Sequence, residues 1–535
     1  MKLSFQYRVV THSERSGDTF FDGQFLSGQG VVHVSETLNG NIVSVRAKGA
    51  YHLEQDEKIF MNGFQTWSFC PEYSRFSKIR GLGHVPKPLM NAYHFDRYAD
   101  YHFAKYENRP GITHGYSWCY FRSGSRYRLI GSLDEKPGYT VFTYDAIRGE
   151  LSIERDCAGI EAQGAYPLFD LFFAEGSEKE VFDAWFSAMN TKPRTPQKLF
   201  GYSSWYNHYE QISEETILQD LSGCKKILKK GDLFQIDDGW EPKVGDWLVP
   251  DQDKFPQDMR SYSDQIHADG YKAGLWLAPF AAQKDSRLVK EHPDWLLRID
   301  GEYWENGSNW GGFYSLDIDN EEVIAYVRQV FTQVFRDWNF DLVKLDFLYA
   351  AAPFGNEKET RAGRMHRALK LLRECAGDRL ILGCGVPVMP AFGLVDYCRV
   401  SCDVSLDWDD KTYMHFFHRE RVSTRHAIGN DIFRRQLNGR AYYSDPDVFF
   451  LREENLSLTD RQKQDLAFVC AVTGGVFLTS DDPGTYTEDQ IRMYKKLRRI
   501  AEHAELKAVS AIPGKGFLIR YLIAGKEKYY FVHWK

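Results

Sequence analysis

Two strand-like segments in the middle of the chain each combine a basic residue with an aspartate. Lys344 and Asp346 are two residues apart in DLVKLDFLYA, and Arg399 and Asp403 lie together in YCRVSCDV. Because side chains alternate along a strand, Lys344 and Asp346 share one face, and so do Arg399 and Asp403. A charge buried on such a face is costly unless it is paired. The pattern therefore predicts either a structural ion pair or a site that uses two carboxylates.

Two carboxyl groups are what glycoside hydrolysis requires, since one attacks the anomeric carbon and the other protonates the leaving oxygen. Lys344 would keep Asp346 ionised, which suits a nucleophile, whereas Asp403 needs a raised pKa to act as an acid. Two other classes remain: Lys344 as the Schiff-base lysine of an aldolase, and a sugar-binding protein without turnover. The presence of both aspartates favours the hydrolase.

The elements around these residues alternate between strand and helix. Helical periodicity fills the gaps between the strand-like runs, and this rhythm predicts a central (β/α)8 TIM barrel over residues 193–503. Such barrels carry their catalytic groups at the carboxyl ends of the strands, where this chain has mostly aspartates. The eight predicted strands are 199–206, 232–240, 272–280, 341–350, 379–386, 397–404, 441–451 and 475–482.

Both flanks of the predicted barrel have strand patterns of their own. Residues 1–192 hold short alternating runs, such as 31–38 and 42–49, separated by turn residues, and end in a helical stretch at 178–190. We expect an N-terminal β-sandwich domain with a connecting helix. Two strand-like runs near the end predict a small C-terminal antiparallel β-sheet domain over residues 504–535.

Composition excludes several classes of function. A net charge of -7 and a pI near 6.2 leave no basic face for nucleic acid, so a neutral substrate fits better. No apolar run reaches the ~18 residues of a membrane span, and the first residues lack the pattern of a secretory signal, which predicts a cytoplasmic protein. The nine cysteines lack metal-ligand spacing, and nothing in the sequence requires a metal or an organic cofactor. The oligomeric state has no signal in the sequence.

Several stretches together resemble glycoside hydrolase family 36, the α-galactosidases related to the melibiases of family 27. They are MNGFQTWSF, SSWYNHY, FQIDDGW, GLWLAPF, VKLDFLYA, ILGCGVPVMPAFGLVDYCRVSCDVSLDW and AYYSDPDVFFLR. These motifs run along nearly the whole chain in a specific order. The resemblance implies a retaining, exo-acting α-galactosidase that forms a covalent galactosyl-enzyme and acts on small oligosaccharides or galactosides.

The resemblance also implies a role for each matching residue. Asp346 would be the nucleophile and Asp403 the general acid/base, with Lys344 and Arg399 contacting hydroxyls near the reacting carbon. The implied substrate-binding residues are Asp237 and Asp238 at the 4- and 6-hydroxyls, Trp67, Trp205 and Trp276 around the pocket, and Cys384 near the 2-hydroxyl.

One segment departs from the pattern of many long family members. After the fifth predicted strand this chain reads GCGVPVMPAFG, as in the shorter bacterial-type subgroup, instead of a Cys-Ser-Ser-Gly-Gly-Gly-type loop. A pocket enlarged at the 2-position would accept an N-acetyl group. An α-N-acetylgalactosaminidase, or an α-galactosyl transferase using the same site, is therefore the alternative.

Overall fold

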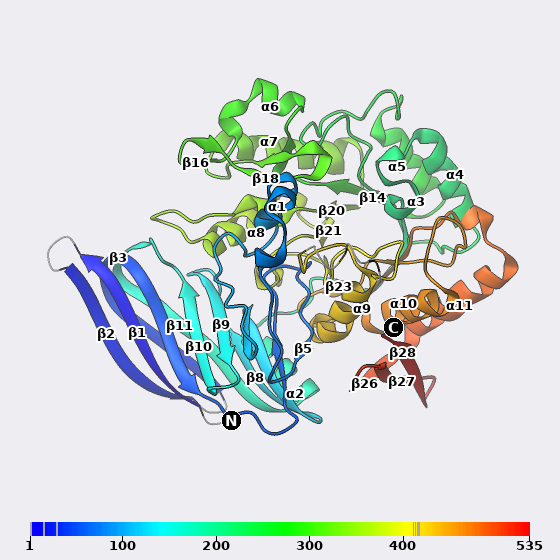
Figure 1. The fold of residues 1–535 in the computed structure, drawn as a ribbon. Helices are drawn as coiled ribbons and strands as arrows, with labels where there is room; N and C mark the ends of the chain where they lie inside the picture. Colours follow the sequence, from blue (N-terminus) through cyan, green and yellow to red (C-terminus); the bar gives the residue numbers. More distant parts are fainter. Residues whose placement is uncertain are drawn as a thin grey trace.

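The computed structural model describes residues 3–13, 17–27, 30–195, 197–409, 411, 414 and 418–534. The protein is multidomain, with an antiparallel sheet, a nine-stranded parallel sheet flanked by helices, and a small antiparallel sheet along the chain (Figure 1). The ends of the predicted outer domains, residues 1–2 and 535, lie outside the described residues.

The first sheet is antiparallel and has eleven strands. Its strand β3 (Gly30–Ala50) continues through Gly40, where the sequence predicted a turn between two short strands. Gly40 has a φ of 109° and still pairs with Ala162 of β11 (Glu161–Ser177), so the glycine is absorbed within the ladder. The other strands are β1 (Leu3–Ser13), β2 (Gly17–Ser27), β4 (Lys58–Met61), β5 (Glu72–Tyr73), β6 (Ile112–Tyr116), β7 (Trp118–Ser123), β8 (Arg126–Ser132), β9 (Tyr139–Asp145) and β10 (Glu150–Asp156).

One hydrophobic core collects side chains from both ends of this sheet. Ile59 and Phe121 come from β4 and β7 at one end, and Phe142 and Ile153 come from β9 and β10 at the other. This is expected of a sheet folded into two layers. Short helices α1 (Lys87–Tyr93), η1 (Leu82–His84) and η2 (Phe95–Arg97) interrupt it, and α2 (Glu178–Ala188) confirms the predicted connecting helix.

The parallel sheet contains a strand within each of the eight predicted runs. Its path begins at β23 (Tyr443–Asp445) and ends at β24 (Val448–Phe449), and only Pro446 and Asp447 separate these two strands in the chain. The remaining strands, in chain order, are β12 (Leu199–Ser203), β13 (Leu233–Ile236), β14 (Lys272–Leu277), β20 (Leu342–Leu345), β21 (Leu380–Gly383), β22 (Tyr397–Arg399) and β25 (Val476–Thr479).

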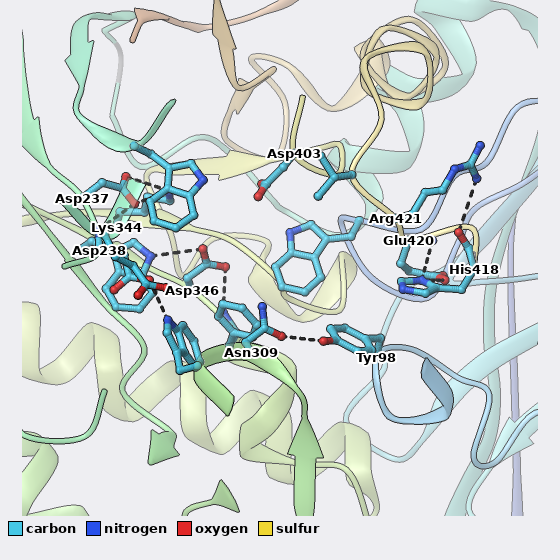
Figure 2. A pocket seen from close by; sticks show the side chains of 17 residues that line it. Tyr98, Asp237, Asp238, Asn309, Lys344, Asp346, Asp403, His418, Glu420 and Arg421 are labelled. Carbon is cyan, nitrogen blue, oxygen red and sulfur yellow. Dashed lines mark hydrogen bonds and ion pairs between the residues drawn. The ribbon is translucent and has the colours of Figure 1, made fainter. Parts of the chain in front are cut away.

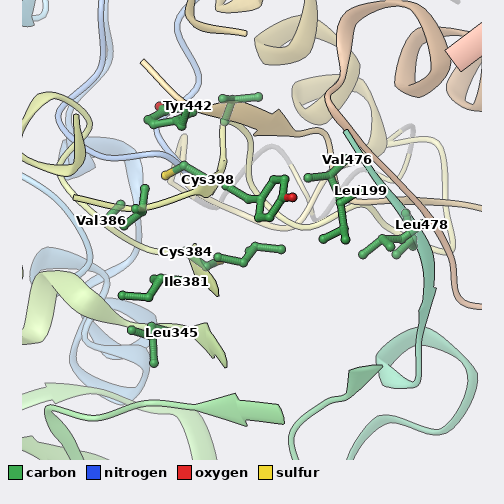
Figure 3. Close-up of a cluster of buried hydrophobic side chains, with 14 of the residues drawn as sticks. Leu199, Leu345, Ile381, Cys384, Val386, Cys398, Tyr442, Val476 and Leu478 are labelled. Carbon is green, nitrogen blue, oxygen red and sulfur yellow. The ribbon is translucent and has the colours of Figure 1, made fainter. Parts of the chain in front are cut away.

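Apolar side chains of these strands form the core beneath the site (Figure 3). Leu345, Ile381, Cys398, Val476 and Leu478 are all buried there. Their packing holds the strand ends in fixed positions, which a site built on those ends requires.

Helices follow the parallel strands as the periodicity predicts. Several begin with a side-chain cap: Thr459 accepts from the backbone of Gln462 at the start of α10, and Thr487 does so from Gln490 at the start of α11. The helices are α3 (Trp205–His208), α4 (Glu214–Cys224), α5 (Met259–Ala268), α6 (Arg287–Glu291), α7 (Glu321–Thr332), α8 (Arg361–Ala376), α9 (Thr424–Phe433), α10 (Asp460–Thr473) and α11 (Glu488–His503).

A long connection between β14 and α7 forms two small sheets of its own. Strands β15 (Ala281–Gln283), β18 (Glu305–Gly307) and β19 (Phe313–Ser315) make one, and β16 (Arg298–Ile299) and β17 (Glu302–Tyr303) make the other. The turn between β18 and β19 carries Asn309 and Trp310, which reach the site described below.

The C-terminal sheet has three strands, one more than predicted. Strand β26 (Glu505–Ile512) escaped prediction because its side chains are mostly exposed or half-buried and show little apolar alternation. Strands β27 (Gly516–Ile523) and β28 (Lys526–His533) confirm the two predicted runs. Asp465 of α10 fixes the sheet by accepting hydrogen bonds from the Tyr530 hydroxyl and the His533 amide. In the described part of the chain, no helix has the length and apolar character needed to cross a membrane.

Candidate active site

A cavity of about 310 Å³ opens at the carboxyl ends of the parallel strands (Figure 2). Eight of the ten residues predicted for the site line it, and the other two, Arg399 and Cys384, are not among its lining residues. The lining residues are Trp67, Tyr98, Trp205, Glu210, Asp237, Asp238, Trp276, Asn309, Trp310, Lys344, Asp346, Phe347, Asp403, His418, Glu420, Arg421 and Val422.

Asp346 follows directly after strand β20 and is held by two N–H donors. The Phe347 amide donates to Oδ1 at 2.9 Å, and the Trp276 indole donates to Oδ2 at 3.3 Å. Phe347 has a φ of 52°, an uncommon left-handed conformation at the point where the chain leaves β20. Burial raises the pKa of Asp346, Lys344 opposes that rise, and Asp403 adds to it.

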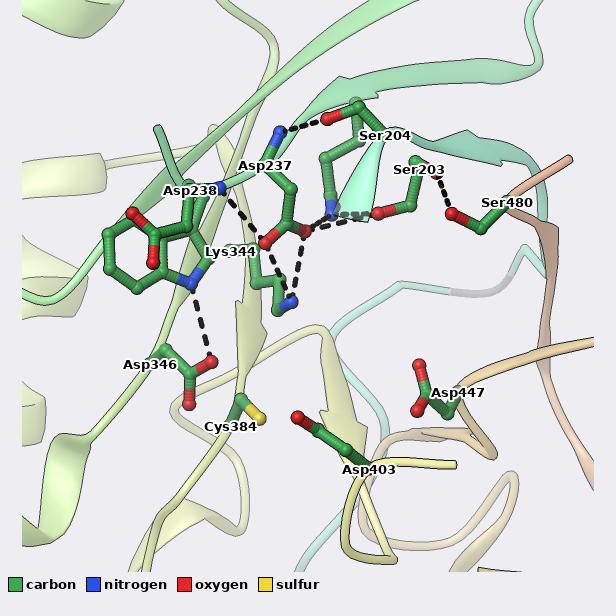
Figure 4. Close-up of polar contacts among 12 residues, drawn as sticks. Ser203, Ser204, Asp237, Asp238, Lys344, Asp346, Cys384, Asp403, Asp447 and Ser480 are labelled. Carbon is green, nitrogen blue, oxygen red and sulfur yellow. Dashed lines mark hydrogen bonds and ion pairs between the residues drawn. The ribbon is translucent and has the colours of Figure 1, made fainter. Parts of the chain in front are cut away.

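The hydrogen-bond partner of Lys344 is Asp237, a pairing that the sequence did not predict. Its Nζ donates to Asp237 Oδ2 at 2.9 Å and Oδ1 at 3.2 Å (Figure 4). Strands β13 and β20 lie on either side of β14 in the sheet, so residues at their ends can meet inside it. Positions along the sequence do not reveal that these two strands are so close. Although burial alone would lower it, Asp237 and Asp346 raise the pKa of Lys344. A permanently charged lysine is a poor amine nucleophile, so the aldolase alternative loses its support.

Asp238 differs from Asp237 in its surroundings. The Trp310 indole donates to its Oδ2 at 2.9 Å. Burial raises the pKa of Asp238, and the neighbouring carboxyl of Glu241 raises it further because two such groups cannot both ionise easily. Asp238 therefore lines the cavity as a carboxyl group that tends to keep its proton, while its Oδ2 accepts from Trp310.

Asp403 lies in a loop and not on a strand, since β22 ends at Arg399. The alternation predicted for residues 399–403 is thus wrong: the Val400 amide still bonds to Asp445, but the chain then turns away. Arg399 nevertheless contacts Asp403 because its Nη2 donates to Oδ1 at 2.9 Å. The Arg399 side chain is 1% exposed and that of Asp403 is 33% exposed, so the guanidinium supports the carboxylate from behind.

The three predicted tryptophans reach the cavity from different elements. Trp276 belongs to β14, Trp205 begins α3, and Trp67 lies in a loop of the N-terminal sheet. The Trp67 indole donates to the Cys384 sulfur at 3.4 Å, so Cys384 is covered by Trp67 and is fully buried. The predicted place of Cys384 near the 2-hydroxyl of the sugar stays a prediction, and the contact with Trp67 adds an indole beside that sulfur.

Nine lining residues were absent from the sequence prediction. Trp310 lies between turn residues in GSNWGG, and its indole was a usable signal because turns seldom need a tryptophan. Tyr98 comes from the N-terminal sheet region and donates to Asn309 Oδ1 at 2.6 Å. His418 and Arg421 lie in a charged run that a sequence reading takes for solvated surface. Among the described residues, no cluster of His, Cys, Asp or Glu is arranged to hold a metal ion.

Comparison with known proteins agrees with this geometry. Residues 199–371 match the family model named Melibiase. Curated relatives include an α-galactosidase of Pediococcus pentosaceus, 31% identical over 122 residues, and one of Lactobacillus acidophilus, 28% identical over 151 residues. The first match covers 22% of this chain and 16% of the relative, and the second covers 27% and 20%.

Solved structures extend the likeness to almost the whole chain. An α-galactosidase from Thermus thermophilus in complex with p-nitrophenyl α-D-galactopyranoside has a TM-score of 0.73 and 28% identity, covering 93% of this chain and 98% of that one. A family 36 α-galactosidase from Geobacillus stearothermophilus shares the fold, with a TM-score of 0.60, 12% identity and coverage of 97% and 73%.

The parallel sheet, the carboxylates at its strand ends and the matching family model define a glycoside hydrolase. Within that class the resemblance to the α-galactosidases of family 36 is confirmed.

Proposed function

We propose that this chain is a retaining, exo-acting α-galactosidase, with Asp346 as nucleophile and Asp403 as general acid/base. The observation that carries the proposal is that both carboxylates line one cavity whose inner end holds Asp237, Asp238 and Lys344. A cavity of about 310 Å³ suits a single terminal sugar ring, and its inner polar groups suit sugar hydroxyls.

The reaction begins with attack of Asp346 on the anomeric carbon while Asp403 gives its proton to the departing oxygen. The bond to the leaving group breaks, and a β-galactosyl ester of Asp346 forms. Asp403, now ionised, takes a proton from water, and that water releases galactose with its α configuration retained. The two N–H donors on Asp346 orient its carboxylate for both steps.

Galactose is favoured over N-acetylgalactosamine by the position of Trp67. The resemblance places the 2-hydroxyl near Cys384, and the Trp67 indole already covers that sulfur. A Cβ at Gly385 would lie 2.8 Å from the same ring, so the indole fits tightly there and leaves little room for an acetamide. The N-acetyl-specific enzyme and the transferase remain alternatives on this site.

We also propose an arrangement of the domains around this site. Because β23 and β24 are two ends of the sheet path and two parts of one predicted strand, we infer that the nine strands close as a (β/α)8 barrel. The proposed domains are 1–192, a β-sandwich, 193–503, the barrel, and 504–535, the C-terminal sheet. The cytoplasmic location stays a prediction.

The test is hydrolysis of chromogenic α-galactoside and α-N-acetylgalactosaminide by the wild type and by Asp346→Ala. We expect release from the galactoside alone, α-galactose as the first product by NMR, and a loss of at least about 10³-fold in kcat in the variant. Release from the N-acetyl sugar alone would change the substrate. Activity surviving in Asp346→Ala, or β-galactose as the first product, would overturn the mechanism.

A further inference from the structure

Asp447, a buried residue outside the cavity, has contacts that lead directly to Asp403. It lies between β23 and β24 with a φ of 76°, a left-handed conformation unusual for a residue with a side chain. One oxygen, Oδ2, accepts from three donors: Arg399 Nη2 at 2.9 Å, the Val404 amide at 2.9 Å and the Tyr206 hydroxyl. The unusual backbone conformation thus coincides with a carboxylate that joins three separate elements.

Two of these three contacts determine where Asp403 lies. Val404 is the next residue in the chain, so its amide bond to Asp447 anchors the loop on one side of Asp403. Arg399 Nη2 is shared, since the same nitrogen donates to Asp403 Oδ1 at 2.9 Å and to Asp447 Oδ2 at 2.9 Å. Figure 4 shows Asp447 and Asp403 close to each other at this edge of the site.

The charges explain why this sharing matters. A buried guanidinium paired with Asp403 alone would stabilise the ionised carboxylate, which opposes proton donation. Asp447 supplies a second acceptor for the same nitrogen, so Asp403 receives only part of the cation's attraction. Burial, together with Asp403 and Asp445, raises the pKa of Asp447, whereas Arg399 lowers it.

We propose that Asp447 is a positioning residue that keeps Asp403 able to donate its proton, by holding the loop after β22 and sharing Arg399 with it. The inference rests on the proposed function, in which Asp403 is the general acid. It assigns Asp447 no contact with substrate, because the residue lies behind the cavity wall.

The consequence is a defect that depends on the leaving group. A nitrophenolate departs readily without a proton, whereas a sugar or alkyl alkoxide requires one, and general acid catalysis contributes about 10²–10⁴-fold. In Asp447→Asn the side chain keeps its shape and an acceptor oxygen but loses its charge, so Asp403 becomes the only carboxylate that accepts from Arg399 Nη2. We expect kcat/KM to fall about 100-fold for methyl α-galactoside and less than about threefold for the p-nitrophenyl substrate.

The alkaline limb of the pH profile for the methyl substrate should also move to lower pH, since Asp403 would ionise more easily. The groups that interact electrostatically with Asp403 are Arg399, Cys402, Tyr206, Tyr209, Asp346, Cys384 and Asp447. The other charged or titratable residues of the cavity are Tyr98, Glu210, Asp237, Asp238, Lys344, His418, Glu420 and Arg421. Of these groups, the substitution Asp447→Asn changes the charge of Asp447 alone, so a shift of the alkaline limb can be attributed to that charge.

Asp481→Asn is the matched control. Asp481 is equally buried at the end of the neighbouring strand β25 and accepts from the Leu451 amide and the Tyr486 hydroxyl, but it does not line the cavity. It should leave the ratio of the two substrates unchanged. This ratio does not depend on the concentration of folded enzyme, and Asp447→Ser, a second variant without the charge, should change it in the same direction.

The outcomes separate this inference from the proposed function. A selective loss on the methyl substrate in both Asp447 variants supports it. An equal fall on both substrates, or an unmoved alkaline limb, would overturn it and leave the α-galactosidase proposal intact. A wild type that cleaves neither galactoside would overturn the proposed function, and the role of Asp447 with it.

Discussion

Neighbouring aspartates at the inner end of the pocket have unequal capacity to bind a substrate. Asp237 already accepts from Lys344 through both oxygens, from Ser203 and Gln235 through Oδ2, and from the Asp238 amide through Oδ1. Its carboxylate is close to saturated, so its main role is to hold Lys344. Asp238 receives a donor from Trp310 and retains acceptor capacity for a sugar hydroxyl.

Trp310→Phe is the substitution that tests this difference. Losing the indole donor leaves the Asp238 carboxyl group less well oriented, and a typical hydrogen bond contributes ~0.5–1.5 kcal/mol. We expect KM for an aryl α-galactoside to rise about tenfold, with a smaller change in kcat. Steady-state kinetics measure both.

The control is Trp304→Phe, in the same long connection. Its indole donates at 3.2 Å to Asn306 and takes no part in lining the cavity. If the two variants raise KM equally, the Asp238 contact has no special role in substrate binding.

At the level of single residues, motif resemblance found eight of the seventeen lining residues but not their hydrogen-bond partners. Asp346, Asp403 and Asp238 were identified because each lies in the carboxyl-terminal half of a predicted strand, in a recognisable stretch. The pairing of Lys344 with Asp237 depends on which strands face each other across the interior, and the covering of Cys384 depends on a loop from another sheet. A linear pattern contains neither fact.

At the level of elements, the eight strands were predictable because their apolar runs are buried on both sides. The ends of the elements were less predictable. Strand β22 stops at Arg399, where the pattern extends to residue 404, because the loop is held by Asp447 and by the Ser423 amide, which bonds to the Asp403 carbonyl. Contacts distant in sequence therefore decide where that strand ends.

Helix α11 allows a direct comparison of a buried ion pair with an exposed one. Arg498 binds both oxygens of Asp232, just before β13, with side chains 6% and 7% exposed. Arg492 binds Asp489 on the exposed face of the same helix. Arg498→Met would leave a buried carboxylate without its cation, which costs about 3–5 kcal/mol.

Chemical or thermal unfolding should therefore show a large loss of stability in Arg498→Met and almost none in Arg492→Met, where water solvates the freed carboxylate. Equal midpoints for the two variants would mean that Asp232 finds another partner or becomes neutral when its cation is removed.

At the level of the whole molecule, the first sheet contributes directly to the pocket on the parallel sheet. The loop at 62–67 carries Trp67 into the cavity, and the buried guanidinium of Arg434, after α9, fixes that loop. Arg434 donates to the side chain of Asn62 at 3.1 Å and to the carbonyls of Gln65 at 3.0 Å, Thr66 at 2.5 Å and Val400 at 2.8 Å.

Arg434→Lys tests whether the hydrogen bonds of the guanidinium, and not its positive charge alone, hold the loop that carries Trp67. A lysine keeps the cation but has three donors on one atom, so it cannot reach the carbonyls on both sides as the planar guanidinium does. We expect a loss of about 2–4 kcal/mol in unfolding free energy from the carbonyls left unpaired, and a rise in KM because Trp67 is less firmly held. Unfolding and kinetics on one sample measure both effects.

Arg440→Lys provides the comparison because Arg440 also joins the two regions, through Asp183 of α2 at 2.7 Å, but far from the cavity lining. It should change KM little, since its partner does not touch the loop that carries Trp67. If Arg434→Lys lowered stability without raising KM, the first sheet would support the fold and not the pocket. A rise in KM confined to Arg434→Lys would mean that substrate binding on the parallel sheet depends on a loop that the first sheet provides.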